Sequence, residues 1–212
     1  MTELIVFDLD GTLIDSMGDI AASVNRMRES FGLAPLPVPE ITAMTGNGAV
    51  TLTERALKDT GCDVTEGVRR WRQFYADHLV ESTTLYDGVA QGLAAMKERS
   101  IRLAVVTNKP TSHAKSILHT LKVDHLLDEI WGGDSGFPLK PDPTALLAFQ
   151  KSHGARKENC WMLGDHYTDL GAGRQAGFQR GFARWGFGEV RDEQFDREFE
   201  NFAAFTAAVT EQ

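Results

Sequence analysis

The N-terminal stretch Leu4-Ile5-Val6-Phe7-Asp8-Leu9-Asp10-Gly11-Thr12 places four apolar residues directly before two carboxylates. Such an apolar run is typical of a strand that is covered on both faces of a sheet. Residues two apart on an extended segment point the same way, so Asp8 and Asp10 are predicted to share one site. Two carboxylates this close repel each other unless a cation neutralises them. A plain strand end with an Asp-Gly turn at Gly11 is the alternative, and this stretch alone leaves both open.

Further apolar runs of strand length recur along the chain. From Leu85 onward they alternate with helical patterns, which predicts βα units and a parallel sheet. We therefore expect an α/β fold with a Rossmann-like parallel sheet. The expected strands after the first are Leu103–Val106, Glu129–Trp131, Trp161–Leu163 and Gly181–Ala183.

Residues 16–82 contain no strand-like run and instead have helical spacing. The first predicted helix has one apolar face, made of Met17, Ile20, Val24, Met27 and Phe31. Ser16 and Asp19 at its start resemble a capping box. Two more helices are expected near Leu52–Leu57 and Val68–Leu79. The sequence thus predicts a helical domain of residues 16–82, inserted after the first strand into a core of residues 1–15 and 83–212.

Polar residues also follow the later predicted strands. In open α/β sheets, ligands bind outside the carboxyl ends of the strands. Thr107 stands at one such end, before a helix that starts near Pro110, and a hydroxyl beside free helix amides suits a phosphate. Lys140 precedes Asp142 and Pro143, which are expected as N-cap and first helical residue. Taken singly, Thr107 is also compatible with a helix cap and Lys140 with a solvated charge.

The segment Gly164-Asp165-His166-Tyr167-Thr168-Asp169 adds two more carboxylates after a predicted strand. A helix is expected to follow and to end at Gly177. Carboxylates that converge without thiolates or a histidine cluster select a hard cation such as Mg²⁺.

The chain has 22 basic and 30 acidic residues and a formal net charge of −8. This charge argues against binding to nucleic acid and against attachment to an anionic membrane, so neither is expected as a partner. No apolar run approaches the ~20 residues of a membrane span, and the N-terminus lacks the features of a signal peptide. Cys62 and Cys160 lie far apart and suggest no disulfide framework, so a cytoplasmic location is expected.

Together and in this order, these motifs resemble those of the haloacid dehalogenase-like hydrolases, from Asp8 to Gly177. The helical insert is similar to the family's C1 cap. The resemblance implies that Asp8 attacks the substrate phosphorus and forms an aspartyl-phosphate. It also implies that Asp10 protonates the leaving oxygen and then takes a proton from the hydrolytic water.

The same resemblance implies the ligand set. Mg²⁺ would be held by Asp8, the backbone carbonyl of Asp10 and Asp165, while Asp169 acts through a water or orients Lys140. The hydroxyl of Thr107 and the backbone amide of Asn108 would hold phosphoryl oxygens. Lys140 would offset the negative charge around Asp8.

Within the family, Gly46-Asn47-Gly48-Ala49 and Val106–Thr111 resemble segments of phosphoglycolate phosphatases. This implies a small phosphorylated metabolite, phosphoglycolate or a similar monoester, with Gly46 and Asn47 contacting it. A monomer or homodimer is expected. His166 departs from the pattern, because relatives often carry a small residue there; it either lines the pocket or flanks the helix start.

Three alternatives remain at this level. A phosphosugar mutase has the same core, but related mutases carry Arg and Ser where this chain has Thr45-Gly46-Asn47-Gly48. A dehalogenase needs neither Asp10 nor Mg²⁺. A non-catalytic binding protein is expected to have lost Asp8 or Asp10, and both are present.

Overall fold

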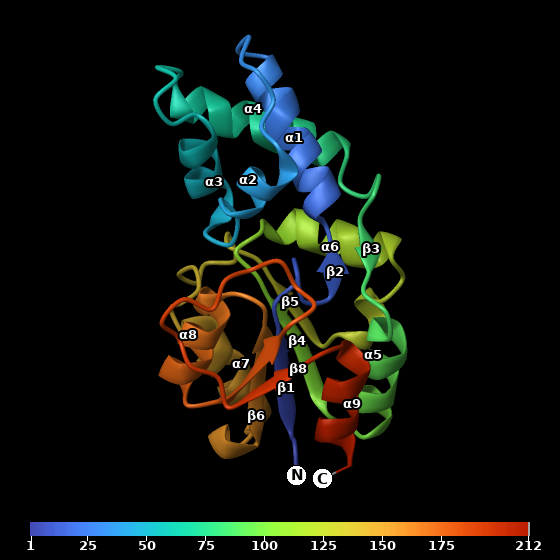
Figure 1. Cartoon of the computed structure of the whole chain (residues 1–212). Coiled ribbons are helices and arrows are strands. Elements are labelled where there is room, and N and C mark those ends of the chain that lie inside the picture. Colours follow the sequence, from blue (N-terminus) through green and yellow to red (C-terminus); the bar gives the residue numbers. More distant parts are fainter. Residues whose placement is uncertain (212) are drawn as a thin grey trace.

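The computed structural model describes residues 1–211 as a sheet with helices on both faces and a second group of helices above one end of the sheet (Figure 1). The sheet has six strands in the order β5-β4-β1-β6-β7-β8, and every pairing within it is parallel. The predicted α/β fold with a parallel sheet is confirmed. The strands are β1 (Leu4–Phe7), β4 (Arg102–Val106), β5 (Glu129–Trp131), β6 (Cys160–Gly164), β7 (Gln179–Ala183) and β8 (Arg197–Phe199).

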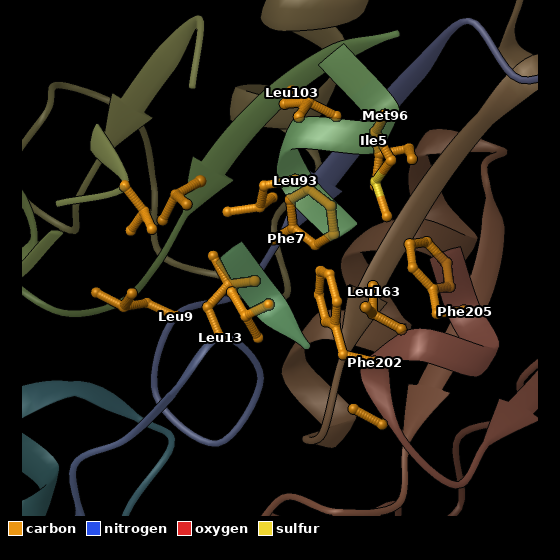
Figure 2. Packing of buried hydrophobic residues seen from close by; sticks show 14 of the residues in the cluster. Ile5, Phe7, Leu9, Leu13, Leu93, Met96, Leu103, Leu163, Phe202 and Phe205 are labelled. Atoms are coloured by element: carbon orange, nitrogen blue, oxygen red, sulfur yellow. The ribbon is translucent and has the colours of Figure 1, made fainter. Parts of the chain in front are cut away.

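Strand β1 lies at the centre of the sheet, between β4 and β6. Its side chains alternate between the two faces. Ile5 and Phe7 belong to one hydrophobic cluster, whereas Leu4 and Val6 belong to another on the opposite face. Figure 2 shows Phe7 beside Phe202 and Phe205, whose rings lie 5.8 and 6.0 Å from the Phe7 ring. The chain runs from β1 outward through β4 to β5 and then returns to β6 on the other side of β1, so strand order reverses between β1 and β6.

Helices cover both faces of the sheet, as parallel connections require. In Figure 1, α5 and α9 lie on one side and α7 and α8 on the other. No helix within residues 1–211 is long and apolar enough to cross a membrane. These helices are α5 (Val89–Glu98), α6 (Thr111–Thr120), α7 (Thr144–His153), α8 (Tyr167–Ala176) and α9 (Phe202–Thr210), with 3₁₀ turns at Asp124–Leu126 and Lys157–Asn159.

The second group of helices has a hydrophobic core of its own, which includes Ile20, Val24, Leu52 and Trp71. The chain enters it after β2 (Ile14–Asp15) and leaves it before β3 (Thr84–Leu85), and these two short strands pair antiparallel. The predicted helical insert after the first strand is therefore present. Its helices are α1 (Met17–Glu29), α2 (Val38–Thr42), α3 (Gly48–Ala56) and α4 (Val64–Asp77).

The structure corrects the predicted start of α7. The N-cap is Pro143 instead of the predicted Asp142, and the first helical residue is Thr144 instead of the predicted Pro143. Asp142 still accepts a hydrogen bond from the Thr144 N–H at 2.8 Å, which satisfies one free amide of the first turn. The sequence analysis also did not anticipate α2, β8 or α9.

The predicted capping box at the start of α1 is wrong. Ser16 makes no side-chain cap, and its hydroxyl instead donates to Asp10 Oδ1 at 2.5 Å. The buried Asp19 carboxylate accepts hydrogen bonds from the backbone N–H groups of residues 81–83 and from the hydroxyls of Ser82 and Thr83. Asp19 therefore ties the chain leaving the helical group to the helix that begins it.

We expect Asp19→Asn to lower the free energy of unfolding by about 2–3 kcal/mol at neutral pH, because buried donors lose a charged acceptor. Burial alone would raise the pKa of Asp19, but the hydrogen bonds from Thr83 and Ser82 outweigh it and lower that pKa below its ordinary value of 3.8. The stabilisation is therefore complete above about pH 3.8 and disappears as the pH falls through the lower pKa of the folded state.

Urea unfolding of Asp19→Asn at several pH values measures this effect, with Glu54→Gln as control because it makes the same chemical change at an exposed site on α3. Equal stability of the two variants at pH 7 would show that the Asp19 contacts contribute nothing.

Candidate active site

Three buried carboxylates meet at the carboxyl end of the sheet. Asp8 directly follows β1, Asp165 follows β6, and Asp169 lies in the first turn of α8. One oxygen from each lies within 4.8 Å of the others. The structure thus brings together residues that are separated by more than 150 positions in the chain.

Lys140 lies among these carboxylates and is itself buried. Its Nζ donates to Asp8 Oδ1 at 2.6 Å and lies 2.7 Å from Asp169 Oδ1. The second approach is an ion pair without hydrogen-bond geometry, so Asp169 Oδ1 is buried and accepts no hydrogen bond from residues 1–211. Burial lowers the pKa of Lys140, but the charges of Asp169 and Asp8 outweigh this and raise it, so the lysine carries its charge in the site.

The carboxylates are not fully compensated by this lysine. Burial, with repulsion from Asp169 and Asp10, raises the pKa of Asp8 to about 6 despite Lys140. Burial and the charges of Asp8 and Asp169 also raise the pKa of Asp165 well above its ordinary value. A group of carboxylate oxygens held together against repulsion, one of them without a donor, fits a hard divalent cation.

Gly11 leaves the space that the Asp165 carboxylate occupies. A Cβ at this position would lie 2.0 Å from Asp165 Oδ2, and the backbone has a φ of +83°. Both constraints favour glycine. The backbone N–H groups of Phe187 and Gly188 donate to Asp165 Oδ2 at 3.0 and 2.8 Å, which fixes the carboxylate from the other side.

Asp10 is paired with Lys109, a residue to which the sequence analysis assigned no role. Lys109 Nζ donates to Asp10 Oδ1 at 2.6 Å and also to the hydroxyl of Tyr75 on α4. Burial lowers the pKa of Lys109, but Asp10 and Tyr75 outweigh this and raise it. The hydroxyl of Ser16 donates to the same Asp10 oxygen. The position of Lys109, two residues after Thr107, was the signal that could have identified it.

Thr107 and Asn108 follow β4 and line the same cavity as the carboxylates. The buried Thr107 hydroxyl accepts a hydrogen bond from the Lys109 N–H at 3.2 Å. The Asn108 side chain accepts from the Lys140 N–H at 2.9 Å and donates to the Gly46 carbonyl at 3.2 Å. Asn108 therefore links the Lys140 loop to the helical group.

The loop before α3 closes over the site from the opposite side. Gly46 has a φ of +94°, and a Cβ there would lie 2.4 Å from His166 Nε2. The Asn47 amide donates to the Tyr167 hydroxyl at 2.5 Å. Of the two residues expected to contact substrate, Gly46 lines the central cavity and Asn47 lines a neighbouring one.

His166 combines the two roles considered for it. Its Nδ1 accepts a hydrogen bond from the Thr168 N–H at 3.3 Å and caps α8, and its backbone N–H donates to Asp169 at 3.1 Å. The ring also lines the central cavity. Burial lowers the pKa of His166 to about 4, so the ring is neutral near pH 7.

The cavity between sheet and helices has a volume of about 80 Å³. Pockets for drug-sized ligands occupy roughly 300–1,000 Å³, so this one suits a small molecule. Its floor carries the carboxylates and lysines. Its roof is mostly apolar and consists of Ile20, Ala49, Leu52, Trp71 and Tyr75.

Comparisons with known proteins agree with this geometry. A family model described as haloacid dehalogenase-like hydrolase matches residues 5–183. A phosphoglycolate phosphatase of Haemophilus influenzae is 36% identical over 95% of each chain, and one of Aquifex aeolicus is 35% identical over 90% of this chain and 88% of that one. A crystal structure described as a predicted phosphoglycolate phosphatase from Haemophilus somnus superposes with a TM-score of 0.91 at 30% identity, covering 98% of this chain and 97% of the other.

The carboxylate cluster predicts that Asp165→Asn has opposite effects on thermal stability with and without a divalent cation. In a chelator, the variant should be at least as stable as the parent, because the change removes one of three repelling buried carboxylates. With Mg²⁺ at a hundredfold excess over its dissociation constant, the parent gains about 2.7 kcal/mol and the variant does not.

Thermal melts of both proteins in chelator and in MgCl₂ measure this, with the exposed Asp192→Asn as control. An equal Mg²⁺-dependent shift in parent and Asp165→Asn would remove Asp165 from the cation site.

Proposed function

The chain belongs to the haloacid dehalogenase-like hydrolases and is a phosphoric monoester hydrolase, and on that basis we propose that it is a Mg²⁺-dependent phosphatase for phosphoglycolate or a similar small ester. The reaction runs through an aspartyl-phosphate on Asp8. The observation that carries the proposal is the Asp8 carboxylate, paired at 2.6 Å with the buried Lys140 ammonium on the floor of a small cavity.

Residues around Asp8 suit a phosphoryl group. The Thr107 hydroxyl and the backbone N–H of Asn108 are donors at the end of β4, and Lys140 supplies a positive charge beside the nucleophile. Phosphoryl transfer depends mainly on positioning and charge stabilisation, which these three residues provide.

The proposed chemistry has two displacements. A carboxylate oxygen of Asp8 attacks phosphorus, the bond to the ester oxygen breaks, and Asp10 gives its proton to that leaving oxygen. A water then attacks the phosphorus of the aspartyl-phosphate while Asp10 takes its proton. This second displacement releases phosphate and restores the Asp8 carboxylate.

Asp8, the backbone carbonyl of Asp10 and Asp165 would hold the cation, with Asp169 acting through a water or by orienting Lys140. All are hard oxygen ligands of the kind Mg²⁺ prefers. When bound, Mg²⁺ supplies positive charge that offsets the carboxylates and the phosphoryl oxygens.

We further propose that residues 16–82 act as a cap domain on the core of residues 1–15 and 83–212. The contacts of Asn47 with Tyr167 and of Asn108 with the Gly46 carbonyl support this, because they join the two parts above the site. A closed cap keeps bulk water from Asp8 during attack, and opening admits product exchange.

Phosphate release from a panel of small monoesters, with Mg²⁺ and with excess chelator, tests the function. We expect phosphoglycolate to rank first or near it and chelator to abolish turnover. Turnover confined to sugar phosphates, or full turnover in chelator, would contradict the proposal.

Asp10→Asn should slow turnover by roughly 10²–10⁴-fold, the usual effect of a positioned proton donor. The loss in the phosphorylation step should be smaller for p-nitrophenyl phosphate than for an alkyl phosphate, because the aryl oxide leaves without a proton. Rapid-quench measurement of the phosphorylated enzyme with both esters checks this. A near-parental rate with both would limit Asp10 to its backbone carbonyl.

Gly46→Ala should lower kcat/KM by roughly 10–100-fold, since the new methyl group meets His166 and displaces the cap loop from its closed position. Gly32→Ala is the matched control: its φ is +73°, and a Cβ there meets nothing within 4 Å. Both variants carry backbone strain, so both should lose about 1 kcal/mol of stability. Equal kcat/KM values for the two variants would mean that contact with His166 is unimportant.

A further inference from the structure

The His166 ring forms one wall of the central cavity, and the proposed reaction gives it no role. His166 directly follows Asp165 in the chain and lines the cavity together with Gly46 of the opposite loop. The residue is only 6% exposed. Its Nε2 has no hydrogen-bond partner within residues 1–211 and is not one of their enclosed unpaired polar atoms, so the exposed part of the ring includes Nε2. The outer edge of the ring therefore faces the cavity.

The same edge lies against the loop before α3. A Cβ on Gly46 would lie 2.4 Å from Nε2, 2.5 Å from Cε1 and 2.7 Å from Cδ2 of His166. Atoms do not approach a Cβ that closely, so the ring has room only because this residue is a glycine. The ring therefore spans the wall from the start of α8 to the loop of the helical group and fills the space between them.

Contacts on its other side hold the ring in this place. Nδ1 accepts a hydrogen bond from the Thr168 N–H at 3.3 Å and lies 2.9 Å from the Thr168 hydroxyl oxygen. The Tyr167 ring packs against it, with centroids 4.2 Å apart. Rotation of the imidazole would break the N-cap of α8, so the ring is a firm part of the wall and its volume is denied to a ligand.

We infer that the His166 ring is the residue that limits the size of the leaving group. With the phosphoryl group at Asp8 on the floor, a leaving group extends toward the loop and the roof, and the ring narrows this path on the α8 side. A shorter side chain at this position would open the space beside Gly46 to bulkier phosphate esters, such as sugar phosphates. The inference rests on the proposed function and adds the single residue that sets its size limit.

A series of variants at this position separates the bulk of the ring from its polar edge. His166→Ser removes both but keeps a residue that caps helices well, whereas His166→Leu removes the ring nitrogens and keeps most of the bulk. The measured quantity is the ratio of kcat/KM for phosphoglycolate over glucose 6-phosphate. His166→Ser should lower this ratio about tenfold or more through a gain on the sugar phosphate, which a misfolded protein cannot produce. His166→Leu should keep a ratio near the parental one.

His113→Ser is the matched control. It makes the same change at a half-buried histidine that lines the neighbouring cavity but not the central one. This variant should keep the parental ratio. An equal gain on glucose 6-phosphate in His113→Ser, or no gain in His166→Ser, would overturn the inference. An equal gain in His166→Leu would also overturn it, because the limit would then come from the polar edge of the ring and not from its bulk.

Binding of phosphonates, which cannot be hydrolysed, is the second readout. Benzylphosphonate has a phenyl ring where ethylphosphonate has a methyl group, so the two ligands differ only in bulk beyond the first carbon. Calorimetric titration in Mg²⁺ gives the ratio of their dissociation constants. His166→Ser should shift this ratio about tenfold toward benzylphosphonate relative to the parent, and His113→Ser should leave it unchanged.

The two readouts separate this inference from the proposed function. Ester hydrolysis with the parental size preference in His166→Ser would overturn the size limit and leave the phosphatase intact. Hydrolysis of neither ester, with a shift in phosphonate binding in His166→Ser, would overturn the proposed function and leave the size limit intact. Should a thermal melt show that His166→Ser is unfolded, His166→Ala makes a similar change in volume and must give the same results.

Discussion

The repulsion between buried carboxylates at the carboxyl end of β1 is the constraint on which the site depends. Asp8, Asp10, Asp165 and Asp169 meet there; within residues 1–211, Lys109 pairs with Asp10 and Lys140 pairs with Asp8 and Asp169, so four carboxyl groups share two ammonium groups. Packing and hydrogen bonds hold such an arrangement together, and the Mg²⁺ that we propose for the site would relieve its repulsion. The central place of β1 in the sheet fixes the backbone of Asp8, and the oxygen atoms around it are of the kind that Mg²⁺ prefers.

Close packing around these groups explains why small residues stand beside them. Gly11 lies directly against Asp165, and a Cβ at Gly164 would lie 2.3 Å from Asp169. On the opposite side, Gly46 lies against His166. Gly11 and Gly164 therefore let the carboxylates lie close to the backbone of the core, and Gly46 lets the helical group approach the core; the resulting small cavity favours a small substrate.

The sequence predicted the floor of the site better than its roof. Asp8, Thr107 and Asp165 each follow an apolar run, and parallel strands bring their carboxyl ends to one edge, so local pattern was sufficient to group them. Trp71 and Tyr75 have helical spacing that any buried helix face shows, and their position above Lys109 depends on how the helical group sits on the sheet.

The prediction at Ser16 and Asp19 was wrong for a related reason. The local spacing fits a capping box, but Asp19 is bonded by donors more than 60 residues away, and Ser16 bonds Asp10. The donors from distant residues outnumber the single backbone N–H that a capping box would offer to Asp19. A pattern within one segment cannot indicate such distant donors.

Locating the phosphoryl group on the enzyme during turnover is the most direct measurement of the proposed mechanism. The reaction with phosphoglycolate would be quenched in acid within milliseconds and the protein digested for peptide mapping by mass spectrometry. The proposed mechanism predicts one base-labile phosphoryl group on the Asp8 carboxylate, formed fast enough to account for turnover and missing from Asp8→Asn. A phosphoryl group on another residue, or steady turnover by Asp8→Asn, would contradict it.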